Sequence, residues 1–275
     1  MRIIFRSAVR MSLPAALFVF VSSSGNSIQA TTIVVARTAN EIVIGADSKV
    51  TDAYGGDLKK QSCKILQIGN LLLAFEGFTV DRRTGSNVPD IARQSLQSKG
   101  AATAAEKVGV LTGLLVSKLF DELPSVQKHE PEAYHIKFSG GRIFLSIVIA
   151  GFEKGRPLVF VRHFRAVQVD PERIGVSVLP DDCLSNCQGE VVTRFLGETA
   201  AIDGLPDDTT GFWQPGLVAG VRQLIETEIS ARSEYVGPPI DIVRIDKRGV
   251  SWIQKRQNAV AHKPGDRASP GRGCC

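Results

Sequence analysis

The chain has 275 residues, of which 43% are hydrophobic and 22% are charged. This composition is typical of a globular protein, and the length suits one domain of generous size. Three of the charges behind the formal net charge of +5 are Arg2, Arg6 and Arg10, and the sequence after residue 30 has 30 basic and 28 acidic residues. Because that balance is nearly neutral and no basic stripe alternates with aromatic residues, the sequence argues against a nucleic-acid-binding protein.

Residues 1–30 have the features of a secretory signal peptide. They contain three arginines and no acidic residue, then an apolar run at 11–21, and they end in the small residue Ala30. The apolar run is shorter than the ~20 residues that a membrane-spanning helix needs. We therefore expect cleavage after Ala30, export to the periplasm or the medium, and a mature chain that begins at Thr31 and has no membrane segment. The alternative is an uncleaved N-terminal anchor.

Four short strands are expected after Thr31. Residues 31–37 and 41–46 are rich in Ile and Val, and residues 64–68 and 71–75 form a second apolar pair joined by a Gly-Asn turn. The polar, glycine-containing residues 47–62 between the two pairs predict a loop.

Two helices are expected next. Residues 90–99 follow Pro89, which is well placed in a first helical turn. Residues 101–123 place apolar side chains three and four residues apart, which predicts one buried face, and Pro124 is expected to end this helix. The apolar positions are Val108, Leu111, Leu115, Leu119 and Leu123.

Strands return in the second half of the chain, with one further helix. The expected strands are 142–152, 157–164, 191–196, 240–245 and 250–253, and the expected helix is 216–230. The polar tail, 254–275, has the composition of a disordered segment. Runs of strands followed by runs of helices indicate an α+β fold. Both groups of strands are apolar on both faces, which predicts a four-layer αββα sandwich of two antiparallel sheets over residues 31–253.

The cysteines agree with an oxidising compartment but do not form a metal motif. Cys183 and Cys187 lie close enough to form a disulfide, and an odd total of five leaves at least one cysteine free or paired between chains. The four histidines are scattered without the spacing of ligands, so we expect no metal and no organic cofactor.

A threonine released at the N-terminus has special chemistry. Its hydroxyl is a weak nucleophile, but its own α-amine, with an unperturbed pKa of ~7.7–8.0, can act as the base. The amine must be largely neutral near pH 7, and a nearby positive charge lowers its pKa. Cleavage after Ala30 would give Thr31 this role.

Three downstream residues suit such a site. Asp47 ends the second expected strand and Lys64 opens the third, so adjacent antiparallel strands can bring both to the start of the first strand. Gly77 follows the fourth strand and can turn its N–H toward a developing oxyanion, a contribution of ~3–4 kcal/mol per donor. Each feature alone is common in ordinary strands and turns. Their order and spacing directly behind a processing site is what favours catalysis.

Residues 31–81 resemble the N-terminal part of proteasome β subunits and of the threonine peptidase ring of the bacterial two-component ATP-dependent protease, both N-terminal-nucleophile hydrolases. The resemblance rests on Thr31-Thr32, on Asp47 sixteen residues later within Ile-Gly-Ala-Asp-Ser, on Lys64 before a β-branched residue, and on Gly77. It implies an αββα sandwich in which Thr31 is the nucleophile, Asp47 and Lys64 tune it, and Gly77 helps to bind the oxyanion. It extends more loosely to residue 253.

The sequence departs from the family in three places. Glu76 stands where the family has alanine before the oxyanion glycine, and the loop before Lys64 has one extra residue. The family's Asp-x-x-Ser-Gly-Gly is replaced by residues 233–238, so Ser233 and Glu234 are only candidates for its accessory groups. The family exposes its threonine by self-cleavage after glycine, whereas Ala30 precedes Thr31 here.

These observations predict a threonine-type peptidase or amidohydrolase that acts on a peptide or amide after export, through an acyl-enzyme. The resemblance also suggests a homo-oligomer. The alternative is a catalytically silent protein of the same fold that serves as a scaffold or binding protein in the cell envelope. Labelling by a β-lactone or epoxyketone would separate the two.

Overall fold

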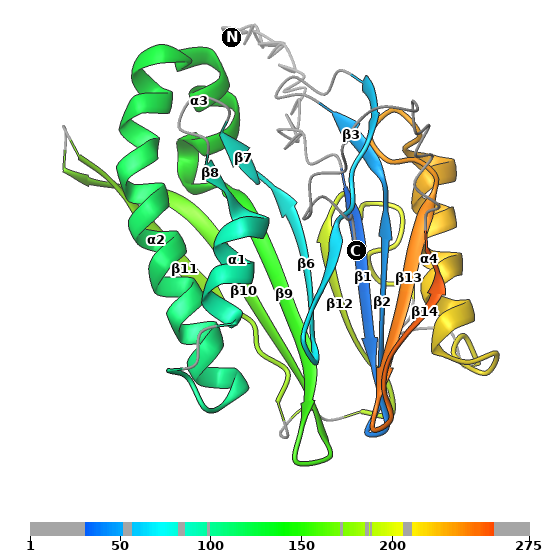
Figure 1. Ribbon diagram of the computed structural model, residues 1–275. Helices are drawn as coiled ribbons and strands as arrows, with labels where there is room; N and C mark the ends of the chain where they lie inside the picture. Colours follow the sequence, from blue (N-terminus) through cyan, green and yellow to red (C-terminus); the bar gives the residue numbers. More distant parts are fainter. Residues whose placement is uncertain are drawn as a thin grey trace, which may run out of the picture.

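Two antiparallel sheets of five strands each lie face to face at the centre of the protein (Figure 1). The computed structural model describes residues 31–51, 57–81, 86–97, 100–170, 173–184, 187, 189–205 and 211–255. The expected signal peptide, 1–30, and all but the first two residues of the expected tail, 254–275, lie outside these ranges. No helix of the described residues is both long and apolar enough to cross a membrane.

The first sheet has the order β12-β1-β2-β13-β14 and the second has the order β11-β10-β9-β6-β5. The strands of the first are β12 (Val192–Gly197), β1 (Thr32–Arg37), β2 (Glu41–Asp47), β13 (Ile240–Asp246) and β14 (Gly249–Gln254). Those of the second are β11 (Arg173–Pro180), β10 (Arg156–Asp170), β9 (Ile143–Glu153), β6 (Leu71–Gly77) and β5 (Ile65–Ile68). Two-stranded pairs join β3 (Lys49–Thr51) to β4 (Asp57–Gln61), and β7 (Val80–Asp81) to β8 (Ser86–Asn87).

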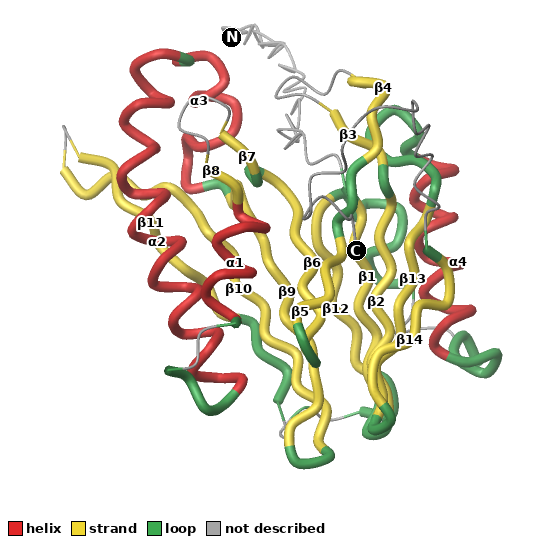
Figure 2. Tube along the Cα trace, in the orientation of Figure 1, coloured by secondary structure: helices red, strands yellow, loops and turns green. Residues whose placement is uncertain are grey.

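Helices cover the outer face of each sheet (Figure 2). α1 (Val88–Leu96), α2 (Ala104–His129) and α3 (Pro131–Phe138) belong with the second sheet, and α4 (Leu217–Ala231) packs on the first. A short 3₁₀ turn, Ser139–Gly141, leads into β9. The mixed α+β class and the two antiparallel sheets are therefore confirmed, and the arrangement is compatible with the predicted sandwich.

Strand alternation explains the three separate cores. In β1, Ile33 and Val35 pack between the sheets, whereas Val34 packs against α4. In β6, Leu73 packs under the helices and Leu72 packs between the sheets. Because each central strand is buried on both faces, its sequence is almost continuously apolar, as predicted.

The expectation that Pro124 ends the second helix was wrong. α2 runs from Ala104 to His129 with Pro124 inside it. A proline within a helix removes one hydrogen bond and costs about 3 kcal/mol, but the following turn buries Val126, which is 2% exposed. The helix begins at residue 104 because Thr103 and Glu106 form a reciprocal capping box.

Three other regions of the chain differ from expectation. The predicted loop at 47–62 contains β3 and β4. β10 continues to Asp170 and pairs with β11, in a region for which no strand was predicted before residue 191. α3 was not expected either, and Pro131 in its first turn follows directly on the end of α2.

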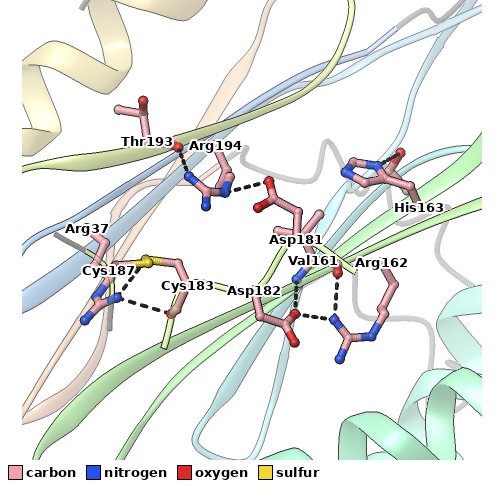
Figure 3. A network of polar contacts seen from close by, with 11 residues as sticks. Arg37, Val161, Arg162, His163, Asp181, Asp182, Cys183, Cys187, Thr193 and Arg194 are labelled. Atoms are coloured by element: carbon pink, nitrogen blue, oxygen red, sulfur yellow. Dashed lines mark hydrogen bonds and ion pairs between the residues drawn. A yellow bond between two sulfur atoms is a disulfide. The ribbon is translucent and has the colours of Figure 1, made fainter. Parts of the chain in front are cut away.

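A short segment after β11 ties the second sheet to the first at one edge (Figure 3). The backbone of Cys183 forms an isolated antiparallel β-bridge with Val159 of β10, and a disulfide joins Cys183 to Cys187. The guanidinium of Arg37, at the end of β1, donates to the backbone oxygens of Cys183 at 3.2 Å and Leu184 at 2.6 Å. The disulfide that the sequence left open is therefore present, and its segment joins the two sheets.

Candidate active site

The ends of several strands meet at one end of the two sheets, the upper end in Figure 1. β1 starts there beside the end of β12, because Thr32 pairs with Gly197. β2 ends there at Asp47, which pairs with Ile240 at the start of β13. In the second sheet, β5 begins and β6 ends at the same level, and Lys64 Nζ reaches Asp47 across the gap between the sheets.

Asp47 is the centre of this end. Its side chain is fully buried, and each carboxylate oxygen accepts two hydrogen bonds. Oδ1 accepts from the Thr32 N–H at 2.8 Å and from Lys64 Nζ at 2.9 Å. Oδ2 accepts from the backbone N–H groups of Lys49 at 3.0 Å and Gly237 at 3.1 Å. One carboxylate thus joins β1, β2, the residue before β5 and the loop before β13.

Lys64 is held close to the start of β1. Its Nζ and the Thr32 nitrogen hydrogen-bond the same oxygen, so the two nitrogens lie no farther apart than the sum of those two bond lengths. Only 5% of Lys64 is exposed, and burial lowers its pKa, while the charge of Asp47 and its hydrogen bond oppose that shift. The structure therefore brings Asp47, Lys64 and the Thr31–Thr32 segment together.

Thr31 is itself buried, with 7% of its surface exposed. Its carbonyl oxygen accepts a hydrogen bond from the Glu198 N–H at 2.7 Å, and the Thr32 hydroxyl donates to the Glu198 carbonyl at 2.6 Å. Gly197 makes this approach possible: its φ is +86°, and a Cβ at that position would lie 1.8 Å from the Thr31 oxygen. The backbone around Thr31 is thus fixed by β12 on one side and by Asp47 on the other.

Gly77 lies where β6 leaves the sheet. Its φ is +91°, in the left-handed region that favours glycine, and a Cβ would lie 2.3 Å from the carbonyl oxygen of Phe144. The next residue, Phe78, donates its N–H to that same carbonyl at 2.7 Å. The sequence therefore needs glycine here for a physical reason, which accounts for the turn at the exit of the strand.

Ser233 and Glu234 are placed differently from the other candidates. Both are exposed, in the loop between α4 and β13, and their backbone carbonyls accept hydrogen bonds from Lys49 Nζ at 2.8 and 2.9 Å. The Glu234 carboxylate pairs with Arg232 at 3.2 Å. Among the described residues, no hydrogen bond or ion pair joins either side chain to Asp47 or Lys64. Their loop supports the site through its backbone.

Three residues of this region carry no clear signal of their role in the sequence. Gly237 binds both Asp47 and Ser48 through its backbone, at 3.1 and 3.2 Å. Glu198 fixes the Thr31 carbonyl, and Arg232 forms an ion pair with Glu198 at 3.4 Å. The glycine of Gly-Pro-Pro and the Gly-Glu pair at the end of β12 were the available signals, but a glycine at a strand end is usually only a turn residue.

Comparisons with known proteins do not assign the chain to a family. No known protein family matches the sequence, and no curated protein matches it. Among the described residues, no group of three or more His, Cys, Asp or Glu side chains is arranged to hold a metal ion.

Proposed function

We propose that this protein is an N-terminal threonine hydrolase of peptide or amide bonds, similar to proteasome β subunits, that becomes active when residues 1–30 are removed. One observation carries the proposal: the buried Lys64–Asp47 ion pair is anchored to the Thr32 N–H, one residue from the threonine that the predicted cleavage would expose. An ion pair at this depth is expensive to bury, and its place at the start of β1 suits a role in tuning Thr31.

In the proposed reaction, the free α-amine of Thr31 takes the proton of the Thr31 hydroxyl while Oγ attacks the carbonyl carbon of the substrate. The oxyanion forms near Gly77, whose N–H is the candidate donor. The amine then gives the proton to the leaving nitrogen, the C–N bond breaks, and an ester remains on Oγ. Water attacks this ester with the same amine as base and releases the acid. The ammonium of Lys64 favours the neutral amine because like charges repel.

Export and processing are part of the proposal. Signal peptidase would cut between Ala30 and Thr31 and so expose the nucleophile only after translocation. The disulfide between Cys183 and Cys187 supports this location, because disulfides persist in oxidising compartments. The charge balance after residue 30 gives no support to binding of nucleic acid.

The test is the mature N-terminus together with covalent labelling. Intact-mass and Edman analysis of the exported protein should give a chain that starts at Thr31, and a β-lactone should add to that residue. The Thr31→Ala variant should lose the label, and the matched Thr31→Ser variant should keep it because serine retains a hydroxyl beside the amine. A start at any other residue, or equal labelling of Thr31→Ala, would contradict the proposal.

A catalytically silent scaffold of the same fold is the second candidate. The exposed positions of Ser233 and Glu234 favour it, because the accessory groups that the family resemblance implies are not beside Asp47. A correct N-terminus at Thr31 without labelling at any pH would support this scaffold.

A further inference from the structure

A second carboxylate, Glu76, lies buried beside Lys64: the N–H of Phe75, the residue before Glu76, donates to the Lys64 carbonyl at 3.2 Å. Glu76, in β6 just before Gly77, is 2% exposed, and among the described residues no group donates a hydrogen bond to either of its carboxylate oxygens. By strand alternation its side chain shares the inter-sheet face with Leu72 and Ala74. A buried carboxylate without hydrogen bonds is costly to ionise, so its position requires an explanation.

The groups around Glu76 come from four elements. Lys64, before β5, and Lys137, on α3, are the cations that act on it, and Lys64 has the larger effect. Ser146 of β9 lies directly opposite in the strand register, close enough to favour the ionised form of Glu76. The Ser146 hydroxyl is also 3.0 Å from Nδ1 of His163 on β10. Burial lowers the pKa of His163, which favours its neutral imidazole, while the charge of Asp181 opposes that shift.

We propose that Glu76 is a second carboxylate for Lys64, a positioning residue that keeps the lysine ammonium charged beside the start of β1 when Glu76 itself is ionised. Asp47 binds Lys64 by a hydrogen bond, and Glu76 acts on it through its charge. The effect of Glu76 on catalysis rests on the proposed function, but the effect of Glu76 on Lys64 does not.

The charge of Glu76 changes within the physiological pH range. Burial raises its pKa to about 7, and Lys64 opposes that shift. Below pH 7 the Glu76 carboxyl is neutral, and the hydrogen-bonded carboxylate of Asp47 remains to compensate Lys64. Above pH 7 both carboxylates are ionised, and together they oppose the loss of the lysine proton that burial favours. The site therefore gains a second negative charge, that of Glu76, as the pH rises through about 7.

The decisive experiment is NMR titration of the lysine side chains, in protein carrying ¹³C-labelled lysine. The Lys64 signal is assigned by its disappearance in Lys64→Met. In Glu76→Gln, the Lys64 transition should move to lower pH, because a nearby negative charge has been removed. The matched control is Glu122→Gln. Glu122 is also a buried glutamate, 3% exposed, but it lies on α2 over the outer face of the sheet. This control should leave the Lys64 transition unchanged.

The Glu76 carboxyl can be observed without any substitution at position 76. In ¹³C-glutamate protein it should titrate near pH 7, and Lys64→Met should move this transition to higher pH. A Glu76 transition at the pH of exposed glutamates, or an unchanged Lys64 transition in Glu76→Gln, would overturn the inference. This measurement remains decisive if Glu76→Gln folds poorly.

Labelling of Thr31 separates this inference from the proposed function. At pH 6, where Glu76 is neutral, wild type and Glu76→Gln should react with a β-lactone at equal rates. At pH 8 the α-amine of Thr31 is still partly protonated, and the variant should react up to about twofold more slowly there because its Lys64 carries less charge. A general loss of structure would slow labelling equally at both pH values and would count against the inference. If the Lys64 transition moves but Thr31 is never labelled, Glu76 keeps its role and the proposed hydrolase fails.

Discussion

Replacing Asp47 by asparagine should be among the most damaging conservative changes in this protein. The carboxylate is fully buried and accepts four hydrogen bonds, two at each oxygen. Asparagine has one oxygen, so in either orientation its NH₂ group faces two donors. The change also removes the negative charge bonded to the Lys64 ammonium. Breaking a buried ion pair from one side costs about 3–5 kcal/mol, which we expect as the loss in free energy of unfolding.

Removing the other partner should cost less. In Lys64→Met the carboxylate of Asp47 keeps three backbone N–H donors, from Thr32, Lys49 and Gly237. The expected loss is about 1.5–3 kcal/mol, the value of a hydrogen bond to a charged group. In the double variant no ammonium is left beside an uncharged amide. Its cost should therefore fall short of the sum of the single costs by about 1–3 kcal/mol.

Urea unfolding of the four proteins, followed by circular dichroism and by the fluorescence of Trp213 and Trp252, measures each free energy by linear extrapolation. Asp47→Asn should be less stable than Lys64→Met, and the effects of the two substitutions should be coupled. If Lys64→Met is the less stable single variant, or if the two costs add within about 0.5 kcal/mol, Asp47 is not the centre of this network.

Two further predictions concern alanine substitutions at Gly197 and Gly69, and the pH dependence of stability that Glu76 causes. Gly197→Ala should lower the free energy of unfolding by roughly 3 kcal/mol through strain and overpacking, because its Cβ would meet the Thr31 oxygen at 1.8 Å. Gly69→Ala, at φ +61° in open space, should cost about 1–2 kcal/mol; equal losses on urea unfolding would contradict this. Because the pKa of Glu76 is raised from 4.5 to about 7, its stabilising contribution is full below pH 4.5 and is lost as the pH rises through 7. Wild type should lose up to about 3 kcal/mol over this range, and Glu76→Gln should not show this decline.

The sequence predicted the central strands because they are buried on both faces. Runs such as 42–46 and 145–150 can hardly be anything other than core strands. It failed where local signals and tertiary packing disagree. Pro124 is a strong local stop, but the burial of Val126 beyond it outweighs the lost hydrogen bond. β11 lies at the edge of its sheet and buries only Ile174 and Gly175, so its sequence lacks the long apolar run of the central strands.

The residues of the candidate site also fall into those that the sequence predicts and those that it does not. Asp47 and Lys64 could be identified because Asp47 ends β2 and Lys64 directly precedes β5, so their spacing from Thr31 relates directly to the antiparallel register. Gly237 and Glu198 could not, because they act through backbone atoms, and any residue type supplies a backbone N–H. They come from positions 190 and 167 residues away from Asp47 and Thr31, respectively, so only the tertiary fold brings them there.

The contacts of Asp47 also bear on the order of processing and assembly. Its four donors are the Thr32, Lys49 and Gly237 N–H groups and the Lys64 ammonium, so none of them is the nitrogen of Thr31. The β12 contact likewise uses the Thr31 carbonyl and not its nitrogen. These bonds therefore form whether or not residue 30 is attached. Under the proposed function, cleavage adds an amine beside the Thr31 hydroxyl to a site that the two sheets have already built. This amine lies close to Lys64, whose ammonium is held by the same Asp47 oxygen that binds the Thr32 N–H.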